Sequence, residues 1–195
     1  MKHSELKKLP LIFKLHDLER LGFSKNQLRG LLKGGKVERV AWGLYRARDS
    51  KTTELETIGL VCKKVPKAVI CLFSALRVQD IGTQAPREVW IALDRKARVP
   101  MFSGLPVRII RFSGQMLQHG VVIKKVQGVP VKITTPARTV VDCFRYRRKI
   151  GIDVALEALR DVLHRKLATR TELIRAAAVC RARTVMRPYL EALSS

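Results

Sequence analysis

The spacing of the hydrophobic residues changes twice along this chain, and this change constrains the fold more than any single motif. In the first fifty residues, leucines recur at intervals of three and four residues, which is the spacing of amphipathic helices. Between residues 67 and 135, apolar residues form short runs separated by turn residues, a pattern typical of strands. Helical spacing returns after Thr135. The sequence therefore predicts an α+β protein whose helices flank a strand-rich middle section.

Two short helices are expected near the N-terminus. The segment 15–22 carries a leucine at every third position and ends in a glycine. Ser24 and Gln27 have the spacing of a capping box, in which each side chain bonds the other residue's backbone N–H, so a second helix is expected to begin there. The glycine pair 34–35 is expected to end it. The inward stripe of this helix would consist of Leu28, Leu31 and Leu32.

The second helix is followed by the pattern of a β-hairpin. Residues 36–40 (KVERV) and 43–46 (GLYR) alternate around the turn sequence Ala41-Trp42-Gly43. A helix, a tight turn, a second helix and a β-ribbon in this order are the pattern of a winged helix-turn-helix. We therefore predict an N-terminal winged helix-turn-helix DNA-binding domain over residues 1–50.

Residues 51–195 are predicted to form a larger mixed α/β domain with a C-terminal helical segment. The polar segment 47–57 marks the boundary or the start of a connecting helix. A short helix is expected to begin at Ser74, and the turn Gln127-Gly128 is expected to join the last two strands. The expected strands are 67–74, 88–94, 107–113, 120–126 and 129–135.

Helices are expected over residues 136–193. The pair Thr135-Pro136 combines a favourable N-cap with a favourable first helical residue. Thr169 and Glu172 repeat the capping box before a further helix. Pro188 is expected to kink or delimit the last helix, because proline disrupts a helix interior.

The chain carries a net charge of +23, from 39 Lys and Arg residues against 16 Asp and Glu residues. The excess is spread evenly, with 12 basic and 5 acidic residues in 1–50, 15 and 6 in 51–142, and 12 and 5 in 143–195. A folded body with such a field attracts polyanions, of which nucleic acid is the commonest. An anionic membrane surface and an acidic protein are the alternative partners.

The basic residues of the N-terminal domain fall where a winged helix would meet DNA. With the leucine stripe facing inward, Lys25, Arg29 and Lys33 lie four residues apart on the outward face of the second helix. When such a face lies in the major groove of DNA, Asn pairs with adenine and Arg with guanine, while lysines contact phosphates. The capping role of Gln27 leaves it less free to read a base. The predicted DNA-binding residues are Ser24, Lys25, Asn26, Gln27, Arg29, Lys33, Lys36, Arg39, Trp42 and Arg46.

Gly30 and Trp42 are two uncharged residues of this predicted DNA-binding surface. Glycine weakens a helix interior by roughly 1 kcal/mol relative to alanine. Gly30 is therefore expected to permit close approach of the backbone to DNA or to the other helix. In the alternative interpretation the cations form only a solvated basic face and Trp42 is a packing residue.

A metal-dependent nuclease is the enzymatic alternative. Asp94 and Lys96 form a D-x-K sequence at a strand end, with Asp80 or Glu88 upstream. Carboxylates of this kind hold a metal ion, and the lysine supports the attacking water. The motif is short, and the sequence contains no Walker loop, dinucleotide glycine pattern or serine-nucleophile elbow. We therefore predict a protein without catalytic residues, metal or cofactor; an RNA-binding module is a further non-enzymatic alternative.

The four cysteines, Cys62, Cys71, Cys143 and Cys180, lie far apart and mostly in apolar runs. They form no C-x-x-C pair and no metal-ligand spacing with the histidines, so buried free thiols in a reducing cytosol are expected. The N-terminus lacks the apolar run of a signal peptide, and no stretch approaches the roughly 20 apolar residues that span a bilayer. The expected location is the cytoplasm, in association with the nucleoid.

The segment FSKNQLRGLLKGGKVERVAWGLYR (23–46) resembles the N-terminal winged helix of AbiEi-type antitoxins, the antitoxin half of bacterial type IV toxin–antitoxin systems. The resemblance continues along nearly the whole chain, and the ordered series of blocks is more specific than the winged-helix segment alone. The further blocks are FSALRVQDIG (73–82), PREVWIAL (86–93), VRIIRFSG (107–114), GVPVKITTPARTVVDCFRYR (128–147), GIDVALEALRD (151–161) and VMRPYLEAL (185–193).

This resemblance implies a transcriptional repressor that binds repeats in the promoter of its own operon. Ser24–Lys33 would be the recognition helix and Lys36–Arg46 the wing. The resemblance also implies a C-terminal domain that counteracts a nucleotidyltransferase-like toxin of AbiEii type, encoded nearby, without requiring a stable complex. Arg138 lies in the shared segment TPART and has no catalytic role implied. A plain DNA- or RNA-binding regulator without a toxin partner is the alternative.

Overall fold

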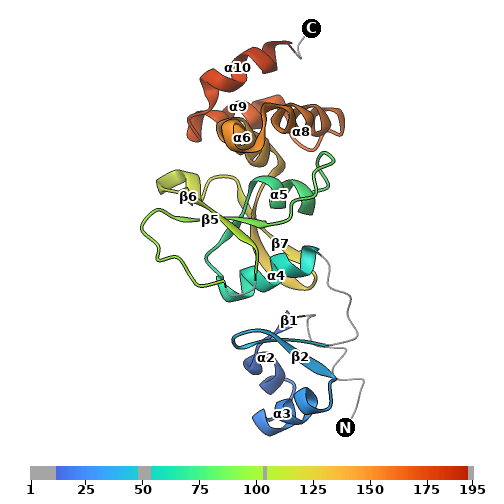
Figure 1. Ribbon diagram of the computed structural model, residues 1–195. Coiled ribbons are helices and arrows are strands. Elements are labelled where there is room, and N and C mark those ends of the chain that lie inside the picture. Colours follow the sequence, from blue (N-terminus) through green and yellow to red (C-terminus); the bar gives the residue numbers. More distant parts are fainter. Residues whose placement is uncertain (1–11, 48–53, 103–104, 193–195) are drawn as a thin grey trace. The chain divides into compact units, whose positions relative to one another are not determined.

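The computed structural model describes residues 12–47, 54–102 and 105–192 (Figure 1). This part of the chain contains helices and two β-sheets, so the coarse prediction of a mixed α+β protein is confirmed. The chain divides into two compact units. The first contains Met1–Pro66, Pro100–Leu105 and Lys125–Val131, and the second contains Lys67–Val99, Pro106–Lys124 and Lys132–Ser195. The predicted domain boundary between residues 50 and 51 lies outside the described residues.

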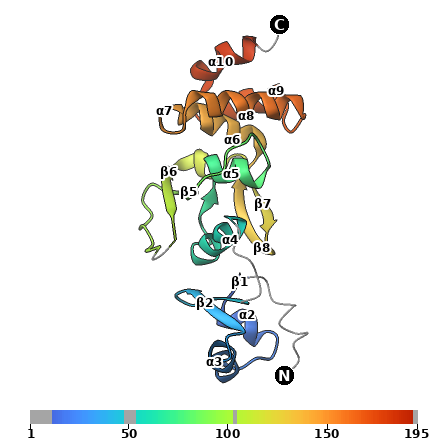
Figure 2. The same ribbon diagram turned by 45° about the vertical axis from the view of Figure 1, so that its right-hand side comes forward.

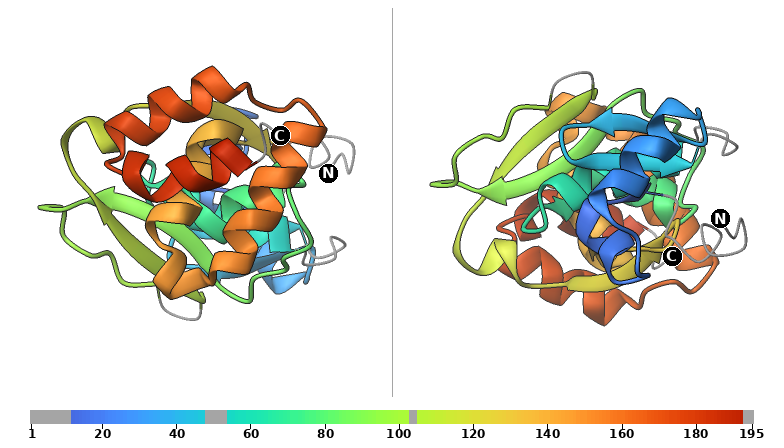
Figure 3. Two further views of the ribbon diagram at one scale, coloured as in Figure 1. Left: turned by 90° about the horizontal axis from the view of Figure 1, so that it is seen from above. Right: turned by 90° about the horizontal axis from the view of Figure 1, so that it is seen from below.

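The first unit combines short helices with a three-stranded antiparallel sheet in the order β1-β3-β2. Its elements are β1 (Ile12–Phe13), α2 (Leu15–Glu19), α3 (Lys25–Lys33), β2 (Val37–Ala41), β3 (Leu44–Ala47) and α4 (Glu54–Lys64). Helices α2 and α3 are the blue helices in the right-hand view of Figure 3. The two expected helices and the expected hairpin are therefore present. Strand β1 is not predicted, because two residues are too short to display an alternating pattern.

Buried leucines hold α2 and α3 together. Leu18 of α2 and the pair Leu28 and Leu31 of α3 lie in one buried cluster. Ser24 caps α3 as predicted: its Oγ accepts the Gln27 backbone N–H at 3.2 Å, and Gln27 Oε1 accepts the Ser24 N–H at 2.7 Å. The cap and the leucine stripe together determine which face of α3 is turned to solvent.

The second unit is built on a five-stranded sheet in the order β6-β5-β4-β8-β7. Strand β4 pairs antiparallel with β5 and parallel with β8, while β5 and β6 are parallel. Helices α6, α8, α9 and α10 gather on one side of the strands (Figure 2). The elements are β4 (Val69–Ile70), α5 (Leu72–Val78), β5 (Val89–Asp94), β6 (Val107–Phe112), the 3₁₀ helix η1 (Gly114–Leu117), β7 (Val121–Val126), β8 (Val129–Thr134), α6 (Pro136–Arg145), α7 (Arg147–Ile150), α8 (Ile152–His164), α9 (Arg170–Val179) and α10 (Arg183–Ala192).

The first predicted strand of this unit, 67–74, is wrong over most of its length. Strand β4 is two residues long, and α5 begins at Leu72 rather than at Ser74. Leu72 has a left-handed backbone conformation, with a φ of 49°, that turns the chain out of the sheet. Ser74 lies inside α5, and its Oγ accepts the Trp90 backbone N–H at 2.8 Å, which ties α5 to β5.

The other predicted turns and caps are present. The turn Gln127-Gly128 has φ values of 48° and 75°, as a two-residue hairpin turn requires. Thr135 caps α6, and Thr169 and Glu172 form the capping box of α9. Pro188 was expected to kink or delimit the last helix; it lies inside α10 and does not delimit it. The short elements η1 and α7 were not predicted, because four residues are too few to display a helical period.

The core of the second unit lies between the sheet and the helices. Trp90 and Phe112 from the strands pack with α6 and α8 in one buried cluster. All four cysteines are free and buried, as predicted. Burial raises the pKa of Cys62 to about 12 and that of Cys180 to about 11, so both thiols stay protonated at neutral pH. In the described part of the chain, no helix is long and apolar enough to cross a membrane.

Candidate nucleic-acid interface

The outward face of α3 is basic and exposed to solvent. Of its inward leucines, Leu28 and Leu31 are buried and Leu32 is half-buried, and the helix contains no acidic residue. Lys25, Arg29 and Lys33 are exposed on the opposite side, and within the described residues none of them forms an ion pair. Asn26 lies beside them, and Arg29 Nη1 donates to Asn26 Oδ1 at 3.4 Å. The fold thus places a guanidinium and an amide together, the two groups that pair with guanine and adenine in a major groove.

Ser24 and Gln27 are used by the helix cap. Their reciprocal hydrogen bonds use the Ser24 hydroxyl oxygen and the Gln27 side-chain oxygen as acceptors. Turning Gln27 toward a base would break this cap, which contributes about 1 kcal/mol to helix stability. Of the predicted DNA-binding residues, these two therefore position α3.

Gly30 has open space beside it. A Cβ at this position would meet no atom within 4 Å. Gly30 is therefore not needed for close packing against α2. It is exposed on α3 one residue after Arg29, on a face that a bound duplex could reach.

The hairpin tip presents a cation and an aromatic ring. Trp42 is 84% exposed, and the Arg39 guanidinium carbon lies 4.3 Å from its ring centroid. This exposure argues against a packing role for Trp42 within the first unit. A cation–π contact at an exposed site contributes about 0.5–1 kcal/mol, enough to favour one orientation of the ring. Lys36 is also exposed, directly before β2.

Arg46 lies apart from this exposed surface. Its side chain is 13% exposed and forms ion pairs with Glu38 on β2 and Glu56 on α4. The Nε atom donates to Glu38 Oε1 at 2.7 Å, and Nη1 donates to Glu56 Oε2 at 3.2 Å. Because two carboxylates occupy its guanidinium, we exclude Arg46 from the candidate interface. The sequence could not reveal this, since Glu56 follows ten residues later, on helix α4.

Helix α4 is also joined to α2 by an ion pair. Lys63 Nζ lies 2.8 Å from Asp17 Oδ2, which also accepts the Lys14 backbone N–H at 2.8 Å. Burial acts to raise the pKa of Asp17, but the hydrogen bonds from Lys63 and Lys14 outweigh it and hold the pKa below the ordinary 3.8. Together with Arg46, this pair makes α4 part of the first unit.

The three carboxylates of the nuclease alternative, those of Asp80, Glu88 and Asp94, have separate partners. Asp94 Oδ1 accepts the Lys96 backbone N–H at 2.8 Å and so stabilises the loop after β5. Glu88 pairs with Arg108 at 3.0 Å, and Asp80 lies on a different loop. Among the described residues, no group of three or more His, Cys, Asp or Glu side chains could hold a metal ion.

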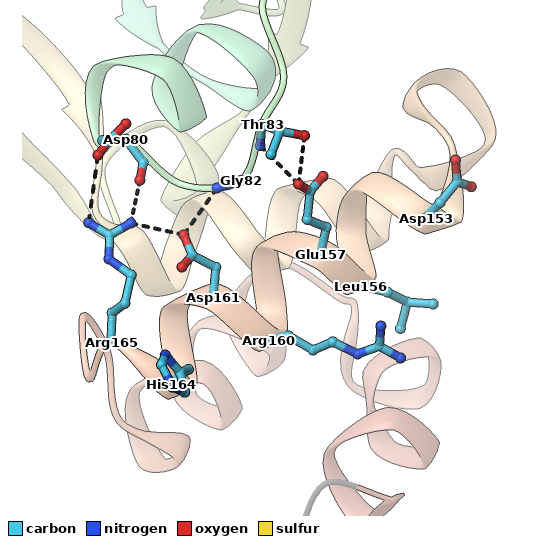
Figure 4. Close-up of a pocket in the computed structure, with 10 residues that line it drawn as sticks. All are labelled: Asp80, Gly82, Thr83, Asp153, Leu156, Glu157, Arg160, Asp161, His164 and Arg165. Atoms are coloured by element: carbon cyan, nitrogen blue, oxygen red, sulfur yellow. Dashed lines mark hydrogen bonds and ion pairs between the residues drawn. The ribbon is translucent and has the colours of Figure 1, made fainter.

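A cavity of about 750 Å³ lies beside α8 in the second unit (Figure 4). Asp161 Oδ2 accepts the Gly82 N–H at 3.0 Å and an Arg165 N–H at 2.9 Å. Glu157 Oε1 accepts the N–H and the hydroxyl of Thr83 at 2.9 and 2.8 Å. These two carboxylates dock the loop after α5 onto α8.

Arg138, from the TPART segment, is a buried structural anchor. It is 0% exposed, and its Nε donates to Asp142 Oδ1 at 3.0 Å. Its two terminal nitrogens donate to the carbonyls of His119 at 2.6 Å and Met116 at 2.7 Å. Burial raises the pKa of Asp142 to about 6, although the Arg138 charge opposes this shift. The spacing of Arg and Asp four residues apart on an apolar helix face is the signal that could have identified this pair.

Comparisons with known proteins bear on the fold. No protein-family model matches the chain, and no curated protein matches it. The crystal structure of the RV2827C protein from Mycobacterium tuberculosis is similar, with a TM-score of 0.61 and 12% sequence identity. The match covers 90% of this chain and 69% of the mycobacterial chain. At this identity the likeness shows a shared fold, and function has to be argued from the site.

Proposed function

We propose that this protein is a DNA-binding transcriptional repressor of AbiEi antitoxin type, and that its first unit is a winged helix-turn-helix. In this proposal α3 is the recognition helix, and strands β2 and β3 form the wing. The observation that carries the proposal is the exposed row of Lys25, Arg29 and Lys33 on a capped helix, next to a hairpin tip with Arg39 and Trp42. Recognition helices use such a face in the major groove.

Each side chain then has a distinct role. Arg29 donates to the O6 and N7 atoms of a guanine, and Asn26 pairs with an adenine. Lys25 and Lys33 contact phosphates and set the register of α3 along the duplex. The Arg39–Trp42 pair of the wing meets the neighbouring backbone or minor groove, where arginine reads groove width.

We further propose that the operator lies in the promoter of the protein's own operon, and that the protein acts in the cytoplasm at the nucleoid. The second unit would counteract a nucleotidyltransferase-like toxin encoded nearby. Support for this part comes from the ordered sequence blocks between residues 73 and 193. Coexpression of this protein with the product of the adjacent reading frame tests it. If that product arrests the growth of the host cells when expressed alone, coexpression should restore growth. Continued growth arrest would contradict the antitoxin role.

DNA recognition is tested by titrating a labelled duplex from the region upstream of the gene, with a shuffled duplex of equal composition as control. Binding to the promoter fragment should be about 1,000-fold tighter or more at physiological salt, the range of specific repressors. Both affinities should fall steeply between about 50 and 200 mM salt, because neutralised phosphates release counterions. Equal affinity for the two duplexes would contradict sequence-specific repression. Stronger binding to an RNA duplex would favour the RNA-binding alternative.

A further inference from the structure

A second concave surface of the second unit differs in chemistry from the cavity of Figure 4. It has a volume of about 480 Å³ and lies among the start of η1, the end of α6 and the end of α9. Its polar side chains are Ser113, Gln115, Arg145 and Arg181, and none of the residues that line it is acidic. In a cavity without carboxylates, two arginines create a site of positive potential.

Two arginines of α6 hold the walls of this cavity in place. Arg138 and Arg145 are seven residues apart, so they lie on the same face of the helix. Arg138 binds the Met116 carbonyl at 2.7 Å and so fastens η1 to α6. Arg145 Nη1 binds the Cys180 carbonyl at 2.5 Å and so fastens the end of α9 to α6. The cavity is therefore preorganised, because its walls are held without a ligand.

The two arginines of the cavity retain donors for a ligand. A guanidinium has five N–H donors, and Arg145, which is half-buried, uses part of them on the Cys180 carbonyl and the Tyr146 side chain. Arg181 is exposed, and its side chain has no partner among the described residues. The nearest buried carboxylate, that of Asp142, is bonded to Arg138. Among the described residues, neither Arg145 nor Arg181 forms an ion pair with a carboxylate.

The chemistry that fits this arrangement is a phosphate group. Arginine binds phosphate through paired N–H donors, more specifically than a lysine does. The Ser113 hydroxyl and the Gln115 amide add neutral donors at the same cavity. The volume lies within the range of small-molecule sites and is sufficient for a nucleotide. We propose that this cavity binds the phosphate group of a small, nucleotide-sized molecule.

The test uses isothermal titration of the full-length protein with ATP, tripolyphosphate and adenosine. Binding of ATP and tripolyphosphate is expected, without binding of adenosine. The variant Arg181→Gly should weaken ATP binding by about tenfold or more, the loss typical of one charged hydrogen-bonding partner. Arg181 has a φ of 54°, a conformation that glycine adopts without strain, so this variant should fold at least as stably as the wild type.

The matched control is Arg160→Ala, which removes an exposed cation beside the cavity of Figure 4. It should leave ATP affinity unchanged. Three results would overturn the proposal: equal ATP affinity in wild type and Arg181→Gly, binding of adenosine as strong as that of ATP, or an equal loss in Arg160→Ala. Displacement of ATP by random duplex DNA at equal phosphate concentration would also overturn it, because the cavity would then hold a nucleic-acid backbone. The experiment contains no promoter DNA, so its failure leaves the proposed repressor function untouched.

Discussion

The guanidinium of Arg39 lies 4.3 Å from the ring centroid of Trp42, at the tip of a hairpin where Trp42 is 84% exposed. The chain has one other tryptophan, Trp90, which is 8% exposed in the core of the second unit. The two indoles therefore report on different environments. The first is placed to respond to anything that the hairpin contacts, and the second serves as an internal reference.

Promoter DNA should change the fluorescence of Trp42. If the wing meets the duplex, water around this indole is replaced by sugar and phosphate, and its emission should be quenched and shifted. The variant Trp42→Phe should lose the change while keeping a ring for Arg39 to stack on. Emission spectra recorded during a DNA titration measure both. A DNA-dependent change that persists in Trp42→Phe would show that the wing is not the responding element.

Replacing Gly30 by alanine should separate stability from DNA binding. Because a Cβ at this position has no neighbour within 4 Å, Gly30→Ala should stabilise the protein by up to about 1 kcal/mol through helix propensity. If the DNA backbone approaches α3 there, the same methyl group should weaken promoter binding several-fold. Urea unfolding and anisotropy titration measure the two effects. Unchanged affinity in the stabilised variant would mean that DNA does not approach Gly30.

The buried pair Arg138–Asp142 should behave as one unit. Arg138→Met leaves a buried carboxylate and two carbonyls without their donor, and Asp142→Leu leaves a buried cation, so each should cost about 3–5 kcal/mol. The double variant should cost less than the sum, because neither charge then remains unpaired. Chemical denaturation of the four proteins measures this coupling. Additive losses would contradict the anchor role of Arg138.

The raised pKa of Asp142 has a defined effect on the pH dependence of stability. Its folded-state pKa of about 6 lies above the ordinary 3.8, so its contribution to stability is fully present below pH 3.8 and is lost as the pH rises through 6. Asp17 has the opposite sign: its lowered pKa contributes stability above pH 3.8 that is lost as the pH falls further. Unfolding free energies between pH 3 and pH 7 test both groups.

Two variants distinguish these groups in that experiment. Asp142→Asn should flatten the decline in stability between about pH 4 and 6. Lys63→Met should reduce only the loss of stability that accompanies protonation of Asp17 as the pH falls below its ordinary pKa. An unchanged slope between pH 4 and 6 in Asp142→Asn would show that this carboxyl does not titrate there.

The sequence predicted the features that depend on neighbouring residues. The capping boxes at Ser24 and Thr169 and the turn Gln127-Gly128 involve residues within three positions of each other, and each is present. The stripe that faces Arg29 outward follows from helical periodicity alone.

Features that depend on distant partners were missed. The sequence predicts Arg46 as a DNA-binding residue of the wing, but in the structure it pairs with Glu56. It predicts Ser74 as the start of a helix, but the Ser74 hydroxyl accepts the Trp90 N–H. The cavity with Arg145 and Arg181 has no local pattern, because its walls come from three separate elements. Tertiary contacts of this kind leave no periodic signal in a single sequence.

Comparison of the variants Arg29→Ala and Lys33→Ala tests most directly whether α3 reads base sequence. Affinities for promoter and shuffled duplexes are measured for both variants, with Arg160→Ala as a charge-matched control on the second unit. Arg29→Ala should reduce the promoter preference by about tenfold or more, the value of one bidentate contact to a base. Lys33→Ala should lower the affinity for both duplexes equally. It should also reduce the slope of log affinity against log salt concentration by about one. If both α3 variants keep the full promoter preference and bind like Arg160→Ala, α3 is not the recognition helix.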